Sequence, residues 1–409
     1  MPGIEGKGRS PFYPDQPVPV ELFIGRQQQL QHILQRGVGQ VSAGKPVYMF
    51  LEGEYGIGKT SIAHFAQWKA EREYGLLAIY ATLDRVESMD DVGEAILNAT
   101  LRSGAYDPKL GEKIRNGMAD FIEQASFLSG TITLKLDALR REAPKVTSGF
   151  LPFLAQTLER VKADGIRGVF LVMDEINGIA NNPKFAHFLK GIVESNAAVS
   201  LGQPTLPILL MLCGVEERRG QLIASHEPVE RIFDVIHIER MALQEMMEFF
   251  RRAFDSVNIM IEPSALGVMA DYAAGFPKVM HLIGNAAFWR DEDGRIDEND
   301  ALDAVLMAAD EVGKRYVNQQ VIAALRSNEY RSILNKIAKV GPNIMRFTRA
   351  EVAAGLTDTE RKKFDNFLQK MKQLHVLRPG EVKGEYVFTM RMARFYIWLE
   401  ARRKERLQL

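Results

Sequence analysis

A glycine-rich segment of eight residues, GEYGIGKT from Gly53 to Thr60, constrains the fold of this chain more than any other feature. It follows an apolar run and precedes a stretch with helical spacing, so it fits the pattern GxxxxGK[ST] between a strand and a helix. Glycines let the backbone curl until its N–H groups and the helix N-terminus face a phosphate. The sequence therefore predicts a phosphate loop. The residues expected to contact the phosphates and the rest of a nucleotide are Gly53, Tyr55, Gly56, Ile57, Gly58, Lys59, Thr60 and Ser61.

An acidic pair, Asp174 and Glu175, follows a second apolar run of the strand type. In phosphoryl transfer, the lysine of the loop reaches the β- and γ-phosphates, and the loop hydroxyl and an acid at a strand end hold Mg²⁺. We therefore assign Lys59 to the phosphates, and Thr60 and Asp174 to the metal. Glu175 is the expected general base, because a second carboxylate beside the first can polarise the attacking water. The two motifs together predict an ATPase that uses ATP and Mg²⁺.

Short apolar runs alternate with helical stretches from about residue 20 to residue 240. Strands buried on both faces read as continuous apolar runs, and helices between them are typical of a parallel sheet. The predicted fold class is therefore α/β, a P-loop parallel sheet flanked by helices. The five predicted strands are Val47–Leu51, Leu76–Thr82, Gly168–Met173, Ile208–Cys213 and Val235–Ile238.

The whole chain divides into four predicted regions. Residues 1–20 carry five prolines and three glycines, which indicates an extended, weakly ordered arm that packs on the first domain only near residues 18–22. Residues 21–241 form the α/β domain, with a short strand or hairpin expected at 131–136. Helical patterns broken by Gly, Pro and acidic turns predict a helical lid at 242–318. Residues 319–409 give helices, a hairpin with a Gly-containing turn and a last helix, which predicts a winged helix.

Composition excludes several classes of protein. The 409 residues carry 52 Lys and Arg and 52 Asp and Glu, so no excess charge directs the chain as a whole to nucleic acid or to an acidic membrane. The single cysteine, Cys213, excludes an intrachain disulfide and a cysteine-rich metal site. The first residues lack the apolar core of a signal peptide, and no apolar run is long enough to span a bilayer. We expect a cytoplasmic protein without a membrane partner.

A segment before the first strand provides a third motif, in addition to the phosphate loop and the acidic pair. Phe23, Ile24, Gly25 and Arg26, followed by Gln29 and Leu30, fit the pattern F-x-G-R-x-x-E-L except that Gln29 replaces the acid. Together these motifs resemble the AAA+ ATPases, in the branch shared by origin-recognition initiators, transposition regulators and STAND signalling ATPases. The resemblance implies an α/β domain followed by a helical lid, and it implies that residues 23–26 lie against the adenine.

The same resemblance implies roles for three other segments. Arg231 lies where an arginine finger of a neighbouring subunit stabilises the γ-phosphate charge, which implies a homo-oligomer; Arg218 and Arg219 are alternatives, and an ion pair with Glu230 or Asp234 is the competing interpretation of Arg231. Pro277 and Lys278 fall in a "G-x-P-R" pattern of the lid that contacts the nucleotide, with Lys278 replacing arginine. At the end of the fourth strand, Cys213 and Gly214 stand where the family has a polar sensor. We interpret Cys213 as a buried apolar side chain.

The sequence of the C-terminal region does not decide whether the chain binds duplex DNA or a protein partner. Its predicted second helix, 357–377, buries Phe364 and Met371 and exposes several lysines and arginines, which could neutralise phosphates of duplex DNA. A DNA-associated regulator or initiator is therefore the first functional hypothesis. A STAND-like signalling or defence ATPase with a protein partner is the second, and an ATPase subunit of a nuclease or transposase is the third. The basic residues in question are Arg361, Lys362, Lys363, Lys370, Lys372, Arg378, Lys383, Arg402, Arg403, Lys404 and Arg406.

Overall fold

The computed structural model describes residues 7–14, 16, 23–104, 109–116, 118, 149–198, 205–339, 345–374, 376–380 and 382–407. The chain forms two compact units, one made of Pro17–Glu239 and the other of Met1–Gln16 together with Arg240–Leu409. The hairpin expected at 131–136 and the packing expected at 18–22 lie outside the described residues. The two units do not separate the predicted lid from the predicted winged helix, so that boundary stays a prediction.

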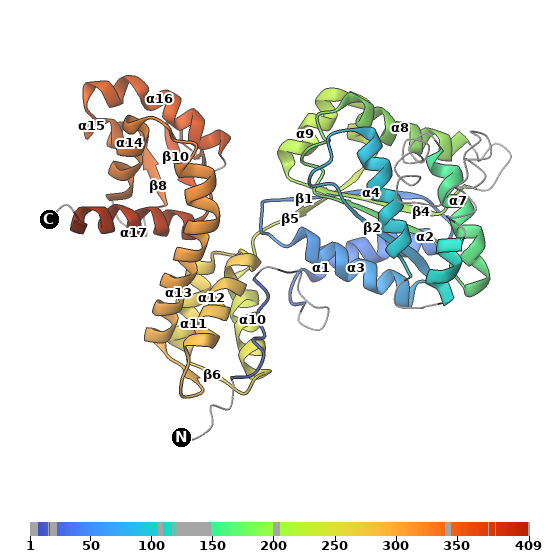
Figure 1. Cartoon of the computed structure of the whole chain (residues 1–409), viewed down its shortest axis with the longest axis horizontal. Coiled ribbons are helices and arrows are strands. Elements are labelled where there is room, and N and C mark those ends of the chain that lie inside the picture. Colours follow the sequence, from blue (N-terminus) through green and yellow to red (C-terminus); the bar gives the residue numbers. More distant parts are fainter. Residues whose placement is uncertain are drawn as a thin grey trace. The chain divides into compact units, whose positions relative to one another are not determined.

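The unit Pro17–Glu239 contains a five-stranded parallel sheet (Figure 1), which confirms the predicted fold class. All five predicted strands are present, and the order across the sheet is β2-β3-β4-β1-β5. Every residue of the inner strands β3 and β4 is buried, as expected for a sheet covered on both faces, whereas the edge strand β5 exposes Asp234 and His237. The strand bounds are β1 Val47–Gly53, β2 Leu76–Thr82, β3 Gly168–Asp174, β4 Ile208–Gly214 and β5 Asp234–Ile238.

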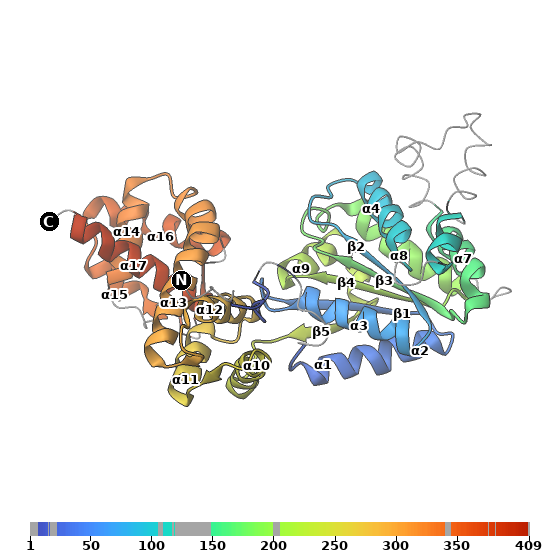
Figure 2. The same cartoon turned by 60° about the horizontal axis from the view of Figure 1, so that its bottom comes forward.

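Helices cover both faces of this sheet. The chain leaves β1 towards the far edge at β2 and then returns strand by strand to β5, and right-handed crossovers therefore place the helix after β1 on one face and the later helices on the other. Figure 2 shows α1 and α2 on one side of the strands and α8 and α9 on the other. The helices are α1 Gln27–His32, η2 Ile33–Val38, α2 Gly39–Ser42, α3 Lys59–Glu73, α4 Met89–Arg102, α7 Phe150–Val161, η3 Lys162–Asp164, α8 Pro183–Ala198, α9 Glu216–Ser225 and η5 Glu227–Arg231.

The second unit is mainly helical. Its first part has four helices, each of which lies where the sequence pattern predicts one, and a two-stranded parallel pairing of β6 with β7. Among the described residues, no helix has the length and apolar content needed to cross a membrane. The elements are α10 Leu243–Asp255, β6 Met260–Ile261, α11 Pro263–Ala273, α12 Pro277–Arg290, β7 Arg295–Ile296 and α13 Glu298–Val312.

The C-terminal part of this unit has its own apolar core, built from residues between Val317 and Ala401. Among the described residues, four helices, of which η6 is the first, and a three-stranded antiparallel sheet of order β8-β10-β9 precede the last helix. Its element order matches the predicted one, and its assignment as a winged helix stays a prediction. The elements are η6 Gly313–Ile322, α14 Asn328–Lys339, β8 Arg346–Thr348, α15 Arg349–Ala354, α16 Asp358–Gln373, β9 Leu377–Pro379, β10 Glu385–Phe388 and α17 Arg391–Leu407.

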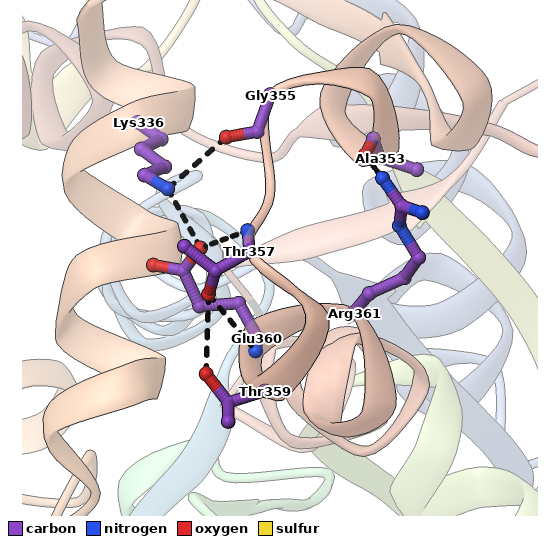
Figure 3. A network of polar contacts seen from close by, with 7 residues as sticks. All are labelled: Lys336, Ala353, Gly355, Thr357, Thr359, Glu360 and Arg361. Carbon is purple, nitrogen blue, oxygen red and sulfur yellow. Dashed lines mark hydrogen bonds and ion pairs between the residues drawn. The ribbon is translucent and has the colours of Figure 1, made fainter.

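The turn between α15 and α16 is fixed by a polar network (Figure 3). Thr357 and Glu360 form a capping box, in which each side chain accepts from the other residue's backbone N–H. Lys336 of α14 donates to Glu360 Oε2 at 2.6 Å and to the carbonyl oxygen of Gly355 at 3.0 Å. Burial alone would raise the pKa of Glu360, but the bonds from Lys336, Ser332 and Thr357 lower it to about 2. Glu360 therefore stays ionised and fixes the start of α16 against α14.

The N-terminal segment packs closely against the helical unit, so the prediction of a weakly ordered arm is wrong for residues 7–13. Phe12 is buried, and its ring lies 5.0 Å from that of Phe254 and 5.9 Å from that of Phe249. A Cβ on Gly284 would come within 2.2 Å of the Phe12 ring, so α12 needs glycine at that position. The Tyr13 N–H donates to Nδ1 of the buried His281 at 3.1 Å. A phenylalanine in a proline-rich stretch gave no sign of this packing, because its partners lie more than 230 residues away along the chain.

Replacing Phe12→Ala should lower the free energy of unfolding of the helical unit by about 3 kcal/mol, because a fully buried aromatic ring is lost and a cavity remains. Urea unfolding, combined with hydrogen exchange of the α12 amides, measures this change. Trp289→Ala on the same helix is the control, because that side chain is 55% exposed and its loss should change little. Equal effects of the two substitutions would contradict the assignment of Phe12 to the core.

Candidate functional site

The glycine-rich segment forms a tight loop between the end of β1 and the start of α3, as its pattern predicts. Gly56 and Gly58 have φ of 74° and 100°, a region in which glycine is favoured, and Gly58 is the N-cap of α3. A Cβ on Gly53 would lie 2.8 Å from the carbonyl oxygen of Ile238, so this position also excludes a side chain. The backbone thus has the curvature that a phosphate-binding loop needs, with a helix N-terminus directly behind it.

Lys59 is held against this loop. Its ammonium group donates to the carbonyl oxygens of Gly53 at 2.8 Å and Glu54 at 3.0 Å, and it lies 5.7 Å from the centre of the Tyr55 ring. Burial lowers the pKa of Lys59, while the charges of Asp174 and Glu175 act in the opposite direction. A lysine that is partly desolvated and surrounded by carbonyl and carboxylate oxygens gains stabilisation from an added anion such as a phosphate.

Asp174 connects the sheet to the helix that follows the loop. The Thr60 hydroxyl donates to Asp174 Oδ2 at 2.7 Å, and the Glu175 N–H donates to Oδ1 at 2.8 Å. The Tyr80 hydroxyl also donates to Oδ2. Asp174 is 3% exposed, so these donors take the place of water around its carboxyl oxygens. The structure therefore brings together Thr60 and Asp174, the two residues that the sequence assigns to Mg²⁺.

Glu175 has an unusual backbone conformation. Its φ is 57°, which costs roughly 1–3 kcal/mol for a residue with a side chain and is found mainly at functional sites. Its carbonyl oxygen accepts from the Asn177 N–H at 2.6 Å, and the next N–H, of Ile176, reaches the Cys213 carbonyl oxygen on β4 at 3.5 Å. The turn that carries Glu175 is thus fixed to the neighbouring strand end. Its role as general base stays a prediction.

Residues 23–26 lie beside the phosphate loop. Arg26 is buried, has φ of 61°, and donates through Nη2 to the carbonyl oxygen of Ile57 at 3.3 Å. The Phe23 ring stacks on Phe65 of α3, with ring centres 4.6 Å apart. Ile24 and Gly25 connect these two contacts. The segment is therefore fixed next to the loop, and its contact with adenine stays a prediction.

The three arginines considered for a finger have different surroundings. Arg219 forms an ion pair with Glu52, with 2.6 Å between Nε and Oε2. Arg218 donates to Gln221 Oε1 at 2.9 Å, and its charge opposes the rise that burial causes in the pKa of Tyr55. Arg231 is exposed at the end of η5, and within the described part of the chain it pairs with neither Glu230 nor Asp234. Of the three arginines, only Arg231 is exposed, and among the described residues it forms no side-chain bond such as those of Arg218 to Gln221 and Arg219 to Glu52.

The remaining predicted site residues fall into two groups. Cys213 and Gly214 end β4 and are fully buried, and burial raises the pKa of the Cys213 thiol, which confirms that it is an apolar filler. Pro277 and Lys278 begin α12 in the other compact unit, after Gly275 with φ of 84°. Their predicted contact with a nucleotide stays a prediction. No group of three or more His, Cys, Asp or Glu that could hold a metal by itself occurs among the residues described.

Sequence reasoning missed a buried carboxylate just before the loop. Glu52, the penultimate residue of β1, is 3% exposed; besides Arg219 it contacts His237 of β5, with 2.7 Å between Nδ1 and Oε1. Glu52 thus connects β1 to β5 and α9. The signal available in the sequence was an acid inside an otherwise apolar strand, which must find a partner if buried.

Arg219→Met should destabilise the α/β unit by about 2 kcal/mol, because it leaves the buried Glu52 with His237 alone. The double variant Glu52→Met, Arg219→Met should cost less than Arg219→Met, since it removes the buried charge as well. Urea unfolding followed by circular dichroism compares the variants. Arg85→Met is the control, because Arg85 is 96% exposed and its pair with Asp84 spans 3.8 Å. A double variant less stable than Arg219→Met would contradict this account.

No protein-family model matches the sequence, and no curated protein matches it. Solved structures do match the fold. The Walker-type ATPase paby2304 of Pyrococcus abyssi is 16% identical with a TM-score of 0.58, over 92% of this chain and 96% of that one. The ORC2 protein of Aeropyrum pernix, in ADPNP-ADP complexes, is 13% identical with a TM-score of 0.58, over 94% and 95%. These likenesses show the fold alone, which the chain shares with this Walker-type ATPase and with the ORC2 protein.

Proposed function

We propose that this protein binds ATP and hydrolyses it to ADP and phosphate. The observation that carries the proposal is the hydrogen bond from Thr60 to Asp174, because it joins the helix of a phosphate loop to an acid at the end of a neighbouring strand. A hydroxyl and a carboxylate in this relation are the protein's usual contribution to a Mg²⁺-nucleotide site. The fold, which is shared with a Walker-type ATPase and with a protein seen in ADPNP-ADP complexes, supports the same activity.

The residues present fit a nucleotide with its metal. The glycine conformations and the helix N-terminus suit a phosphate, and Lys59 supplies one positive charge beside it. Thr60 and Asp174 supply oxygen ligands, which Mg²⁺ prefers, directly or through water. When bound, Mg²⁺ would neutralise charge that develops on the phosphate oxygens. The chain's own part is to orient the phosphates through the loop and Lys59, and to hold the metal's place through Thr60 and Asp174.

Glu175 is the proposed base for the attacking water. Its strained backbone turns it out of the strand immediately after Asp174, so the two adjacent carboxylates have different surroundings. Asp174 is buried and fully engaged, whereas Glu175 is only partly buried. Two carboxylates in different environments can take two roles, here metal ligation and acceptance of a proton from water.

Glu175→Gln should keep nucleotide binding and lower ATP turnover by roughly 10²–10⁴-fold, because glutamine fills the same space but cannot accept the proton. Lys59→Ala should weaken nucleotide binding itself. Phosphate release measures turnover, and binding of a fluorescent ADP analogue measures occupancy. Glu94→Gln on α4 serves as the matched control. Undiminished turnover in Glu175→Gln would show that another group acts as the base.

We also propose that Arg231 acts on a nucleotide held by a neighbouring copy of the chain. Its exposure at the end of η5 supports this role, because a residue that acts between subunits must be accessible from outside its own subunit. The ion pair of Arg219 with Glu52 argues against Arg219 as the finger. A homo-oligomer is part of this proposal.

Duplex DNA is the partner that we propose for the C-terminal part, with a winged helix as the contacting module. Some of the basic residues of this part are already engaged, since Lys363 pairs with Glu329 and Arg361 donates to the carbonyl oxygen of Ala353. Others have no acidic partner within the described ranges, and these free charges support a phosphate-binding surface. They are Lys362, Lys370, Lys372, Arg378 and Lys383.

The double variant Lys362→Glu, Arg378→Glu should weaken binding to duplex DNA and reduce the slope of log affinity against log salt by about 2, one unit for each lost phosphate contact. Fluorescence anisotropy with a labelled duplex, across a range of salt concentrations, measures both. Arg251→Glu, on α10 and paired with Glu248, is the control. Absence of salt-sensitive binding in the wild type would favour the alternatives, a STAND-like switch with a protein partner or a subunit of a nuclease or transposase.

A further inference from the structure

One polar side chain at the site comes from none of the sequence motifs that form it. Tyr80 lies in the middle of the apolar strand β2, and its hydroxyl donates to Oδ2 of Asp174. The same oxygen accepts from the Thr60 hydroxyl at 2.7 Å. The other oxygen, Oδ1, accepts from the Glu175 N–H at 2.8 Å. Thr60 belongs to the helix after the phosphate loop, and Glu175 belongs to the acidic pair. Tyr80 therefore donates to this carboxylate from a different element, the strand β2.

The register of the sheet explains how Tyr80 reaches the carboxylate. Strands β2 and β3 are paired so that Thr82 stands opposite Asp174 and Tyr80 stands opposite Val172. Residues two apart on a strand share a face, so Tyr80 lies on the same face of the sheet as Asp174. The length of the phenol ring then spans the offset of two residues along the strand.

The ring of Tyr80 is fixed by helix α3. His64 stacks on it, with ring centres 4.0 Å apart and an angle of 13° between the planes. His64 lies one helical turn after Thr60, so the two residues share a face of α3. One helix face thus supplies a direct donor to Asp174 through Thr60 and a support for the second donor through His64. The two donors to Oδ2 come from α3 and from β2.

We infer that Tyr80 is a positioning residue for the metal site. It holds the Asp174 carboxylate in the orientation that Mg²⁺ binding requires, and it does so independently of Thr60. This inference rests on the proposed function, because it concerns the same nucleotide site. Residues that hydrogen-bond to a metal ligand fix its orientation, and their loss typically lowers metal affinity or activity by 10–100-fold. Loss of the Tyr80 hydroxyl leaves Oδ2 with the Thr60 donor alone, and that hydroxyl must also serve the metal.

The alternative is that Tyr80 only packs against His64 and the sheet. The two roles differ in what they affect. A packing role would change stability, or would change nucleotide binding with and without Mg²⁺ alike. A positioning role changes only the part of nucleotide binding that depends on Mg²⁺.

Tyr80→Phe separates these roles, because it keeps the ring and its stacking on His64 and removes only the hydroxyl. Tyr48→Phe is the matched control. Tyr48 is a partly buried tyrosine on β1 of the same sheet, and its hydroxyl accepts from Asn196 Nδ2 at 3.4 Å, outside the phosphate site. Binding of a fluorescent ADP analogue is measured as Mg²⁺ is added, and separately in EDTA. Thermal unfolding of each protein shows whether the fold is kept.

Tyr80→Phe should raise the half-saturating Mg²⁺ concentration about 10-fold and leave binding in EDTA unchanged. Tyr48→Phe should match the wild type in both. An unchanged or lower half-saturating Mg²⁺ concentration in Tyr80→Phe would overturn the inference while leaving the proposed function intact. Equal weakening in Mg²⁺ and in EDTA would also overturn it, in favour of a packing role. Absence of any nucleotide binding by the wild type would overturn the proposed function and this inference with it.

Discussion

The site depends on a single buried carboxylate, that of Asp174. Its Oδ2 accepts from α3 through Thr60 and from β2 through Tyr80, and its Oδ1 accepts from the backbone at Glu175. Because a buried charge is costly without partners, these donors must stay together whenever the carboxylate is ionised. The phosphate loop is therefore connected to the sheet at the point where a metal would sit. A movement of α3 away from β3 would break the bond from Thr60 to Oδ2.

The same principle operates on the other side of the loop. Glu52, one residue before the end of β1, is a buried carboxylate between Arg219 of α9 and His237 of β5. The loop from Gly53 to Gly58 thus starts directly after the buried carboxylate of Glu52. The helix that follows the loop, α3, is hydrogen-bonded through Thr60 to the buried carboxylate of Asp174. Both acids fix neighbouring elements to the carboxyl ends of the parallel strands, which is where such sheets bind ligands. Glycine curvature gives the loop its shape, and these two carboxylates hold its ends.

The sequence predicted the sheet well, because strands buried on both faces leave uninterrupted apolar runs such as Ile208–Cys213. Helices of the second unit were equally visible, since Pro277 and Asp297 mark their starts. The packing of Phe12 on α10 and α12 was not predictable, since it depends on contacts between distant parts of the chain. Local pattern carries no information about such a pairing.

Within the site, motif spacing located the loop and Asp174, whose contact through Thr60 the structure contains. It did not reveal Tyr80, His64 or Glu52, because each acts through register or helix face and not through a motif. A tyrosine in a buried strand does require a partner for its hydroxyl, but only the pairing of β2 with β3 identifies that partner as Asp174. The sequence motifs thus identify the residues that would contact the nucleotide. The strand pairing and the helix faces identify the residues that fix those side chains in place.

Whether the loop and Asp174 form a Mg²⁺-nucleotide site is tested most directly by hydrogen exchange of the wild-type chain with and without Mg²⁺-ADP. At about 100 times its dissociation constant, a ligand that binds only the folded state adds about 2.7 kcal/mol of stability. We expect slower exchange at residues 53–62 and at 174–177, with the largest change in the loop. Unchanged exchange in both segments at saturating Mg²⁺-ADP would contradict such a site.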